Sequence, residues 1–223
     1  KYPVVIYVYG GPHAQMITDT WLGGLGLWQY YMAQKGYVMF TLDNRGSANR
    51  GFEFESIIHR NLGIEETKDQ IKGVEYLKTL PYVDWDRIGV HGWSYGGFMT
   101  INLMTEHSDI FKVGVAGGPV IDWKYYEVMY GERYMDTPET NPEGYEKTSI
   151  LGKIKNLKGR LLVIHGGVDP VVVPQHSMDL LLKSQELDIQ VDFYMYPNSK
   201  HNVRGRERIH LMQKVTDYFD TYL

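Results

Sequence analysis

Short apolar runs alternate with stretches of helical periodicity along most of the chain, and this alternation leaves few folds open. The apolar runs, which are typical of buried strands, occupy residues 2–11, 37–43, 87–92, 112–118, 160–167 and 191–197. Helical periodicity falls near 24–34 and over 62–80, 97–107, 173–186 and 206–222. Apolar strands separated by helices predict an α/β fold, in which a mostly parallel central sheet carries helices on both faces.

One segment departs from this alternation. Residues 119–158 are rich in Tyr, Pro, Glu and Asn, and they are too long for a simple crossover between two strands. We expect them to form an inserted cap of short helices near the active face. The 223 residues, of which 43% are hydrophobic, suit one domain that spans 1–223.

Composition argues against several classes of protein. The net charge of −4 and the pI of about 6.1 offer no basic surface for nucleic acid or anionic lipid. No run of about 18 apolar residues occurs, so we expect no transmembrane segment in this chain. The lack of cysteine removes disulfides, thiol catalysis and cysteine-based zinc sites.

Motifs for cofactors and metals are missing as well. In the glycine-rich sequence at 23–29, Gln29 stands where a dinucleotide fingerprint needs its third glycine, and no strand directly precedes it. The histidines are dispersed, and no H-E-x-x-H sequence occurs. We therefore expect neither a cofactor nor a metal ion.

The sequence Gly92-Trp93-Ser94-Tyr95-Gly96 fits the G-x-S-x-G pattern of a nucleophile elbow. There the serine stands on a tight strand-to-helix turn, and the positions two before and two after it approach neighbouring backbone, so only small residues fit. The pattern alone is weak, and the alternative is a glycine-rich turn with an incidental serine. Its place between an expected strand and an expected helix favours a nucleophile. We expect Trp93 to pack under the elbow and keep it rigid.

A nucleophilic serine needs a base, and the base needs an acid that orients it. In α/β-hydrolases the chain order is serine, acid, histidine. His165 precedes the best acid, and His176 and His210 fall inside expected helices, whereas His201 follows the last expected strand. Asp169 follows the strand at 160–167. Because loops at the carboxyl ends of parallel strands carry the chemistry, we expect Asp169 and His201 to complete the triad.

The oxyanion of the reaction needs two hydrogen-bond donors. The backbone N–H of Tyr95, directly after the nucleophile, is one of them. The second is expected in the loop after the first strand, Tyr9-Gly10-Gly11-Pro12. Spacing alone leaves two choices open there, a backbone N–H or the hydroxyl of Tyr9.

Several longer motifs carry a resemblance to a known family: YPVVIYVYGGP, DNRGSANRG, GWSYGGFMT, IFKVGVAGGPVIDWKYYEVMYGERYM, HGGVDPVVV and KHNV. Together they resemble the prolyl oligopeptidase family of serine peptidases, and within it the dipeptidyl peptidase IV branch. The resemblance covers essentially the whole chain and implies an α/β-hydrolase fold. Members of the family also carry an N-terminal β-propeller, so this chain is expected to be the hydrolase domain alone.

The resemblance implies a role for individual residues. Ser94, Asp169 and His201 match the triad, and Tyr9 matches a tyrosine that donates to the oxyanion. A further set matches an apolar pocket for the proline ring that precedes the cut bond: Tyr95, Val120, Trp123, Tyr126, Tyr130 and Val172. Aromatic faces hold such a flat, rigid ring well. For residues 123–130 the alternative is an aromatic cap that simply packs on the core.

One motif departs from the dipeptidyl peptidases, which usually have Asp-Asp-Asn where this chain has Asp169-Pro170-Val171. The motifs here look more like those of prolyl tripeptidyl aminopeptidases, so we expect release of Xaa-Xaa-Pro from free N-termini, with Xaa-Pro release as the alternative. An exopeptidase must also neutralise the substrate ammonium, and Glu127 is a candidate for that anion.

Two further functions use the same sequence features. A carboxylesterase or acylaminoacyl-type peptidase has the same triad, and a non-catalytic interaction module is known among relatives of this branch. The expected partners are peptides with proline near a free N-terminus. By resemblance, the full-length protein is expected to form homodimers and to lie in the periplasm, on the cell surface or outside the cell.

Overall fold

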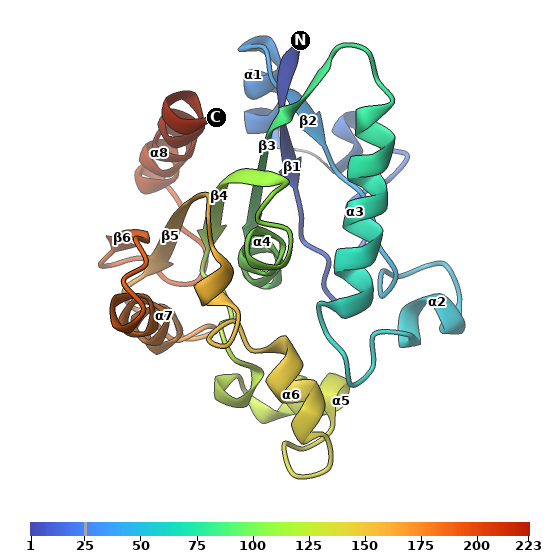
Figure 1. Ribbon diagram of the computed structural model, residues 1–223, viewed down its shortest axis with the longest axis vertical. Coiled ribbons are helices and arrows are strands. Elements are labelled where there is room, and N and C mark those ends of the chain that lie inside the picture. The colour runs from blue at the N-terminus through green and yellow to red at the C-terminus, as the bar shows by residue number, and fades with distance from the viewer. Residues whose placement is uncertain (25) are drawn as a thin grey trace.

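A computed structural model describes residues 1–24 and 26–223. Six strands of this part of the chain form one sheet: β1 (Tyr2–Tyr7), β2 (Val38–Phe40), β3 (Val83–Trp93), β4 (Phe111–Gly117), β5 (Arg160–Gly166) and β6 (Asp192–Tyr196). Their order is β2-β1-β3-β4-β5-β6, and every neighbouring pair is parallel. The structure therefore confirms the predicted α/β architecture, and the described sheet is parallel throughout (Figure 1).

Helices connect the strands. The α-helices are α1 (Leu27–Gln34), α2 (Phe52–Ser56), α3 (Ile64–Lys78), α4 (Tyr95–Glu106), α5 (Val128–Met135), α6 (Pro142–Thr148), α7 (Gln175–Glu186) and α8 (Arg206–Tyr222). Short 3₁₀ turns are η1 (Trp21–Gly24), η2 (Trp123–Tyr125) and η3 (Ile154–Asn156). The helix expected near 24–34 begins at Leu27, and residue 25 lies outside the described residues.

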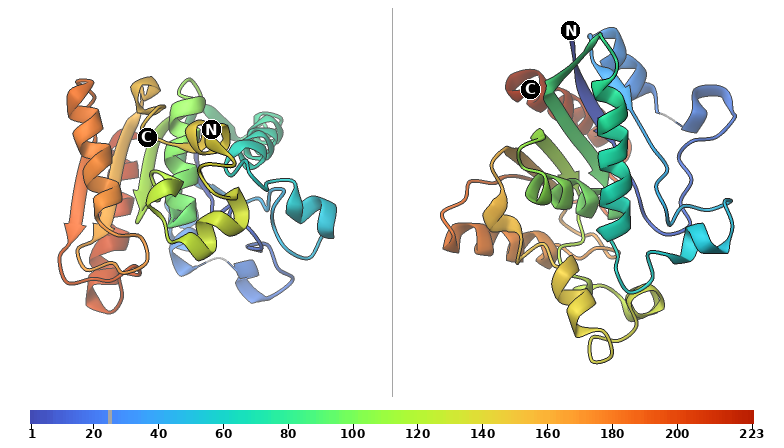
Figure 2. Two further views of the ribbon diagram at one scale, coloured as in Figure 1. Left: turned by 90° about the horizontal axis from the view of Figure 1, so that it is seen from below. Right: turned by 45° about the vertical axis from the view of Figure 1, so that its right-hand side comes forward.

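The sheet separates two apolar layers. Buried side chains of α3, α4 and α7 pack on one face, and those of α1 and α8 pack on the other. Figure 2 shows this in its right-hand view, where α3 lies in front of the strands and α8 behind them. Within β5, Leu161 and Val163 join the first layer, while Leu162 and Ile164 join the second. Burial on both faces explains why the strand is apolar at every position.

Two strands, β1 and β2, are at least four residues shorter than their apolar runs suggested. β2 ends at Phe40, although the apolar run extends to 43, and beyond it the Leu42 carbonyl bonds to a side chain instead of a neighbouring strand. The Gln70 amide donates to the Leu42 carbonyl at 3.2 Å and to Asn44 Oδ1 at 3.0 Å. β1 ends at Tyr7, and Gly10 then takes a positive φ of 78° that ends any extended chain.

The segment 119–158 forms the short helices that were predicted. It contains η2, α5, α6 and η3, and α5 and α6 lie beyond the carboxyl ends of the strands (Figure 1). Because all strands run the same way, the loops after β1, β3, β5 and β6 open onto this same side. Within 1–24 and 26–223, no helix combines the length and the apolar character needed to cross a bilayer.

Candidate active site

Ser94 stands alone between β3, which ends at Trp93, and α4, which begins at Tyr95. Its φ of 62° and ψ of −119° are unfavourable for a residue with a Cβ, so this turn is strained. A Cβ at Gly92 or Gly96 would lie 2.3 or 2.2 Å from the Val8 carbonyl oxygen. The two glycines are therefore needed for β1, the turn and α4 to meet, which is the geometry expected of a nucleophile elbow.

Asp169 and His201 are brought together from the loops after β5 and β6. His201 Nδ1 donates to Asp169 Oδ2 at 2.7 Å. Because a carboxylate only accepts, this bond fixes the tautomer and leaves Nε2 of the neutral ring free to take a proton. Asp169 Oδ1 accepts from the backbone N–H groups of Val171 and Val172 at 2.8 and 3.0 Å.

The charge state of Asp169 follows from these contacts. Its side chain is buried, and burial raises the pKa of the carboxyl. Hydrogen bonds from His165, His201 and the Val171 N–H act in the opposite direction and together hold the pKa well below its usual range. Asp169 is therefore ionised at any pH at which a histidine base works.

His165 supports this carboxylate, a role that the sequence did not predict because its partners are set by the tertiary fold. The side chain is fully buried in β5. Its Nε2 donates to the Val172 carbonyl at 2.8 Å and lies 3.5 Å from Asp169 Oδ2, and its Nδ1 accepts from the Ser177 hydroxyl at 2.6 Å. The ring thus links the Asp169 loop to α7.

We expect His165→Leu to lower kcat/KM for a proline amide by about 10²-fold, since small displacements of a catalytic group have effects of this size. His165→Gln retains a donor near the position of Nε2, so it should keep most of the activity. Steady-state kinetics of the full-length protein test this, with His107→Asn, at the far end of α4, as the control. Equal losses in the Leu and Gln variants would contradict a positioning role.

Trp93 connects the elbow to the histidine loop rather than only packing under the turn. Its indole Nε1 donates to the main-chain carbonyl of His201 at 2.7 Å. The ring lies against β4, where a Cβ at Gly117 would come within 1.9 Å of Trp93 Cε3. A Cβ at Gly118 would lie 3.3 Å from His201 Cε1. The residue before Ser94 therefore holds the backbone of the candidate base.

Tyr9 lies in the loop after β1, at the same carboxyl edge of the parallel sheet as the elbow. Its ring centroid is 6.1 Å from that of Tyr95. Burial raises the pKa of the Tyr9 phenol, and the nearby Tyr7 and Tyr134 raise it further. The phenol keeps its proton at neutral pH and is a hydrogen-bond donor there.

The six residues expected to form the proline pocket belong to one cluster. Tyr95, Val120, Trp123 and Val172 are buried within it, and Tyr126 and Tyr130 pack against it half-buried. Trp123 is central: its ring centroid lies 5.3 Å from Tyr95, 5.6 Å from Tyr126 and 5.8 Å from Tyr130. Aromatic side chains from α4, η2 and α5 thus form one wall, and Val120 and Val172 belong to the same core.

Glu127 is exposed at the start of α5, beside Tyr126. Its carboxylate accepts from the Met129 N–H at 3.0 Å and so caps the helix. Capping the helix gives Glu127 a structural role. Its role in binding a substrate ammonium group stays a prediction. In the described part of the chain, no group of three or more His, Asp or Glu residues stands close enough together to hold a metal ion.

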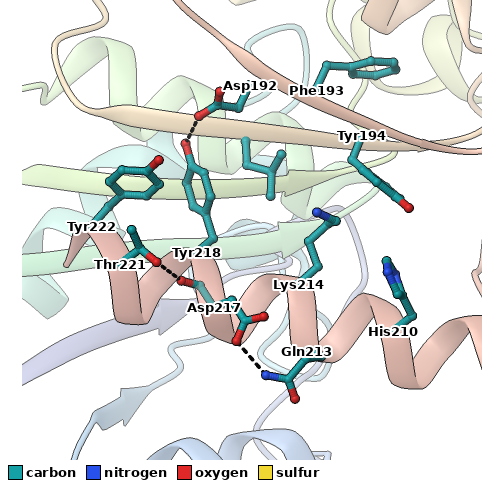
Figure 3. A pocket seen from close by; sticks show the side chains of 11 residues that line it. Asp192, Phe193, Tyr194, His210, Gln213, Lys214, Asp217, Tyr218, Thr221 and Tyr222 are labelled. Atoms are coloured by element: carbon teal, nitrogen blue, oxygen red, sulfur yellow. Dashed lines mark hydrogen bonds between the residues drawn. The ribbon is translucent and has the colours of Figure 1, made fainter.

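A hollow of about 460 Å³ lies elsewhere, between β6 and α8 (Figure 3). Tyr218 donates to Asp192 there at 2.7 Å, and Lys214 Nζ lies 4.2 Å from the centroid of the Tyr194 ring. None of the candidate site residues lines it. The constellation around Ser94 is therefore separate from this hollow.

Comparison with known proteins agrees with this geometry. The sequence profile of the prolyl oligopeptidase family matches residues 25–223. Human dipeptidyl peptidase 8 is 38% identical over 211 residues, which are 93% of this chain and 24% of that protein. This chain therefore spans about a quarter of the length of that curated relative.

Solved structures agree as well. Dipeptidyl peptidase 4 of Porphyromonas gingivalis is 36% identical, with a TM-score of 0.95 over 100% of this chain and 31% of that one. A Bacteroides ovatus structure, provisionally named a dipeptidyl aminopeptidase IV, is 59% identical, with a TM-score of 0.99 over 100% of this chain and 32% of that one. The fold is that of an α/β-hydrolase, and the chain belongs to the prolyl oligopeptidase family.

Proposed function

We propose that this chain is the catalytic domain of a serine exopeptidase that cuts after proline near a free N-terminus. The observation that carries the proposal is the constellation of a strained serine at the end of β3 and a histidine oriented by a buried carboxylate. In α/β-hydrolases this constellation performs acyl transfer. The aromatic wall of Tyr95, Trp123, Tyr126 and Tyr130 supports proline as the residue before the cut bond.

The proposed reaction has two halves. His201 Nε2 takes the proton of the Ser94 hydroxyl while Oγ attacks the carbonyl carbon of the proline residue. The Tyr9 hydroxyl and the Tyr95 N–H donate to the oxyanion. His201 then returns the proton to the leaving amine, which departs and leaves an ester on Ser94.

Water completes the reaction. His201 takes one of its protons as the oxygen attacks the ester carbonyl, and it returns that proton to Ser94 Oγ when the peptide acid leaves. Asp169 stays ionised throughout and stabilises the imidazolium that forms in each half. Every proton moves between the substrate, water and these side chains, so the reaction needs no cofactor.

The proposed selectivity for proline rests on the aromatic wall. A proline ring is compact, apolar and rigid. Because it has no freely rotating side-chain bonds, packing it against aromatic faces costs little conformational entropy. The wall made by Trp123, Tyr126 and Tyr130 is suited to it. A long or branched side chain in that position would displace the wall.

The length of the released peptide is the finer question. Asp169-Pro170-Val171 favoured a tripeptide, and the apolar side chain of Val171 is 46% exposed and offers no amide to the substrate. The relatives are named as dipeptidyl enzymes, and these names do not support tripeptide release. We therefore propose Xaa-Pro release as the main activity and retain Xaa-Xaa-Pro release as the alternative.

Chromogenic amides of Gly-Pro and Ala-Ala-Pro distinguish the two activities in the full-length protein. We expect kcat/KM to be at least about tenfold higher for Gly-Pro, because an exopeptidase that binds the substrate ammonium group at a fixed distance from the serine accepts one length of peptide. N-acetylated Gly-Pro amide is the control and should be cleaved poorly. A preference for Ala-Ala-Pro would overturn dipeptide release and leave cleavage after proline intact.

A fluorophosphonate probe tests the proposed nucleophile directly. The folded full-length protein should be labelled on Ser94, and mass spectrometry of the digested protein would locate the label. Absence of labelling would favour a non-catalytic interaction module. Labelling with rapid turnover of acetate esters and indifference to proline would favour an esterase or acylaminoacyl peptidase. The proposal of a homodimer and of an envelope or secreted location rests on the family alone.

A further inference from the structure

Glu66 is a fully buried carboxyl group that the proposed reaction does not use. It lies in the first turn of α3, and its side chain has no exposed surface. Its Oε1 accepts from the Tyr95 hydroxyl at 2.6 Å, whereas Oε2 has no hydrogen-bond partner among the described residues. Burying a carboxyl group is costly, so a role for its single side-chain partner is worth examining.

The beginning of α3 is packed tightly against the aromatic wall. Gly63, which precedes α3, has a φ of 84°, and a Cβ there would lie 2.7 Å from Phe98 Cζ. Phe98 in turn packs edge-on against Tyr95 and Trp123, with centroid separations of 5.4 and 5.3 Å. Glu66 therefore reaches the Tyr95 hydroxyl from behind the proposed proline pocket.

Tyr95 joins the pocket to the nucleophile. It is the first residue of α4, its N–H is the proposed oxyanion donor, and its ring packs on Trp123. The hydroxyl end of this ring is held by Glu66, while the Cα end is fixed by the elbow. Because the Tyr95 ring is held at both ends, it is restrained to a single orientation.

The surroundings of Glu66 contain no compensating cation in the described structure. Lys153, which lies on the same side of the sheet, bonds to Asn102 and Glu106 instead. Arg45 and Lys68 pair with the neighbouring Glu65. Burial raises the pKa of Glu66 to about 7, although the hydrogen bond from the Tyr95 hydroxyl acts to lower it. In either protonation state, one oxygen remains able to accept from the Tyr95 hydroxyl.

We propose that Glu66 is a positioning residue that sets selectivity for proline by holding the Tyr95 ring as a flat wall of the pocket. The inference rests on the proposed function, because it assigns that pocket to the residue before the cut bond. Losing the acceptor frees the ring to move, and a loosened wall distinguishes a proline ring less well from a small side chain. Chemistry on a substrate that does not fill the pocket should be affected much less.

The test uses the full-length protein with Gly-Pro and Gly-Ala amides and with p-nitrophenyl acetate. In Glu66→Met, which keeps the bulk and removes the acceptor, we expect the ratio of kcat/KM for Gly-Pro over Gly-Ala to fall about tenfold, mainly through a higher KM for Gly-Pro. Turnover of the acetate ester should stay within about threefold of the wild type. Glu66→Gln keeps an acceptor and should retain the wild-type ratio.

Two further variants keep the test decisive if Glu66→Met does not fold. Tyr95→Phe removes the hydroxyl from the other side and should lower the ratio in the same direction. Glu65→Met, one residue earlier in α3, removes an acidic side chain that pairs at the surface, and it should leave the ratio unchanged.

The outcomes separate the inference from the proposed function. A wild-type protein without preference for proline would overturn the proposed function. A wild-type preference that persists in Tyr95→Phe, or in Glu66→Met, would overturn only the role of Glu66. Equal losses on the amide and on the acetate ester would show a general structural role and would also overturn it.

Discussion

Replacing Ser94 by alanine is expected to lower kcat for a Gly-Pro amide by about 10⁴- to 10⁶-fold, the loss seen when a nucleophile is removed from a serine hydrolase. The substitution removes only Oγ, while the Asp169–His201 hydrogen bond of 2.7 Å remains. Alanine meets the same strain as serine at a φ of 62°, because both have a Cβ. The loss should therefore come without a loss of stability.

Steady-state kinetics and a thermal unfolding curve of the full-length protein measure both halves of this expectation. The unfolding midpoint should move by no more than about 2 °C, which corresponds to a small fraction of a typical free energy of unfolding. Ser108→Ala, in the turn after α4, serves as the control and should keep full activity. More than about one per cent of wild-type kcat in Ser94→Ala would contradict its role as nucleophile.

Asp169→Asn is expected to lower kcat by about 10⁴-fold, as loss of the orienting acid does in serine proteases. The contacts of Asp169 make this substitution especially unfavourable. Its Oδ1 accepts two backbone N–H groups, and its Oδ2 accepts from His201 and lies 3.5 Å from the His165 Nε2–H. An amide NH₂ placed on either side would face donors. Asparagine would then favour the wrong tautomer of His201.

Asp169→Asn should also change how the free energy of unfolding depends on pH in the acid range. Because the folded pKa of Asp169 lies below its ordinary value of about 4, this group contributes stability above that pH and loses the contribution as the pH falls through and below it. Chemical denaturation between about pH 6 and pH 3 should therefore show a steeper loss in the wild type than in Asp169→Asn. Asp188→Asn, at an exposed turn with a φ of 56°, is the control. Equal slopes would contradict the lowered pKa.

Much of the fold was predictable because a strand that is buried on both faces of its sheet must be apolar at successive positions. Strands such as β5 are apolar at each position from Leu161 to Ile164 because the sheet is covered on both faces. The short helix α2 was not predicted, because the residues before it are dominated by turn formers. The early end of β2 depended on Gln70, whose side chain reaches that backbone only after folding.

Some residues of the candidate site were likewise predictable from the sequence, and others were not. The elbow and the order of Ser94, Asp169 and His201 were predicted because local turns and chain order constrain them. The burial of Glu66 could not be predicted, because an acidic residue in the first turn of a helix is ordinarily at the surface. Its burial depends on where Phe98 and Tyr95 pack. Hydrogen-bond partners that are distant in sequence, such as those of His165, escape any local pattern.

The cap at 119–158 contributes Val120, Trp123, Tyr126 and Tyr130 to the proposed pocket, while the three proposed catalytic side chains all lie outside it. Under the proposed function, catalytic machinery and substrate choice are encoded in largely separate stretches of the chain. Mutations in the cap can alter which peptide is accepted and leave the serine, acid and histidine where they are. Such a division lets one hydrolase scaffold diversify its substrates by changes in a single inserted segment.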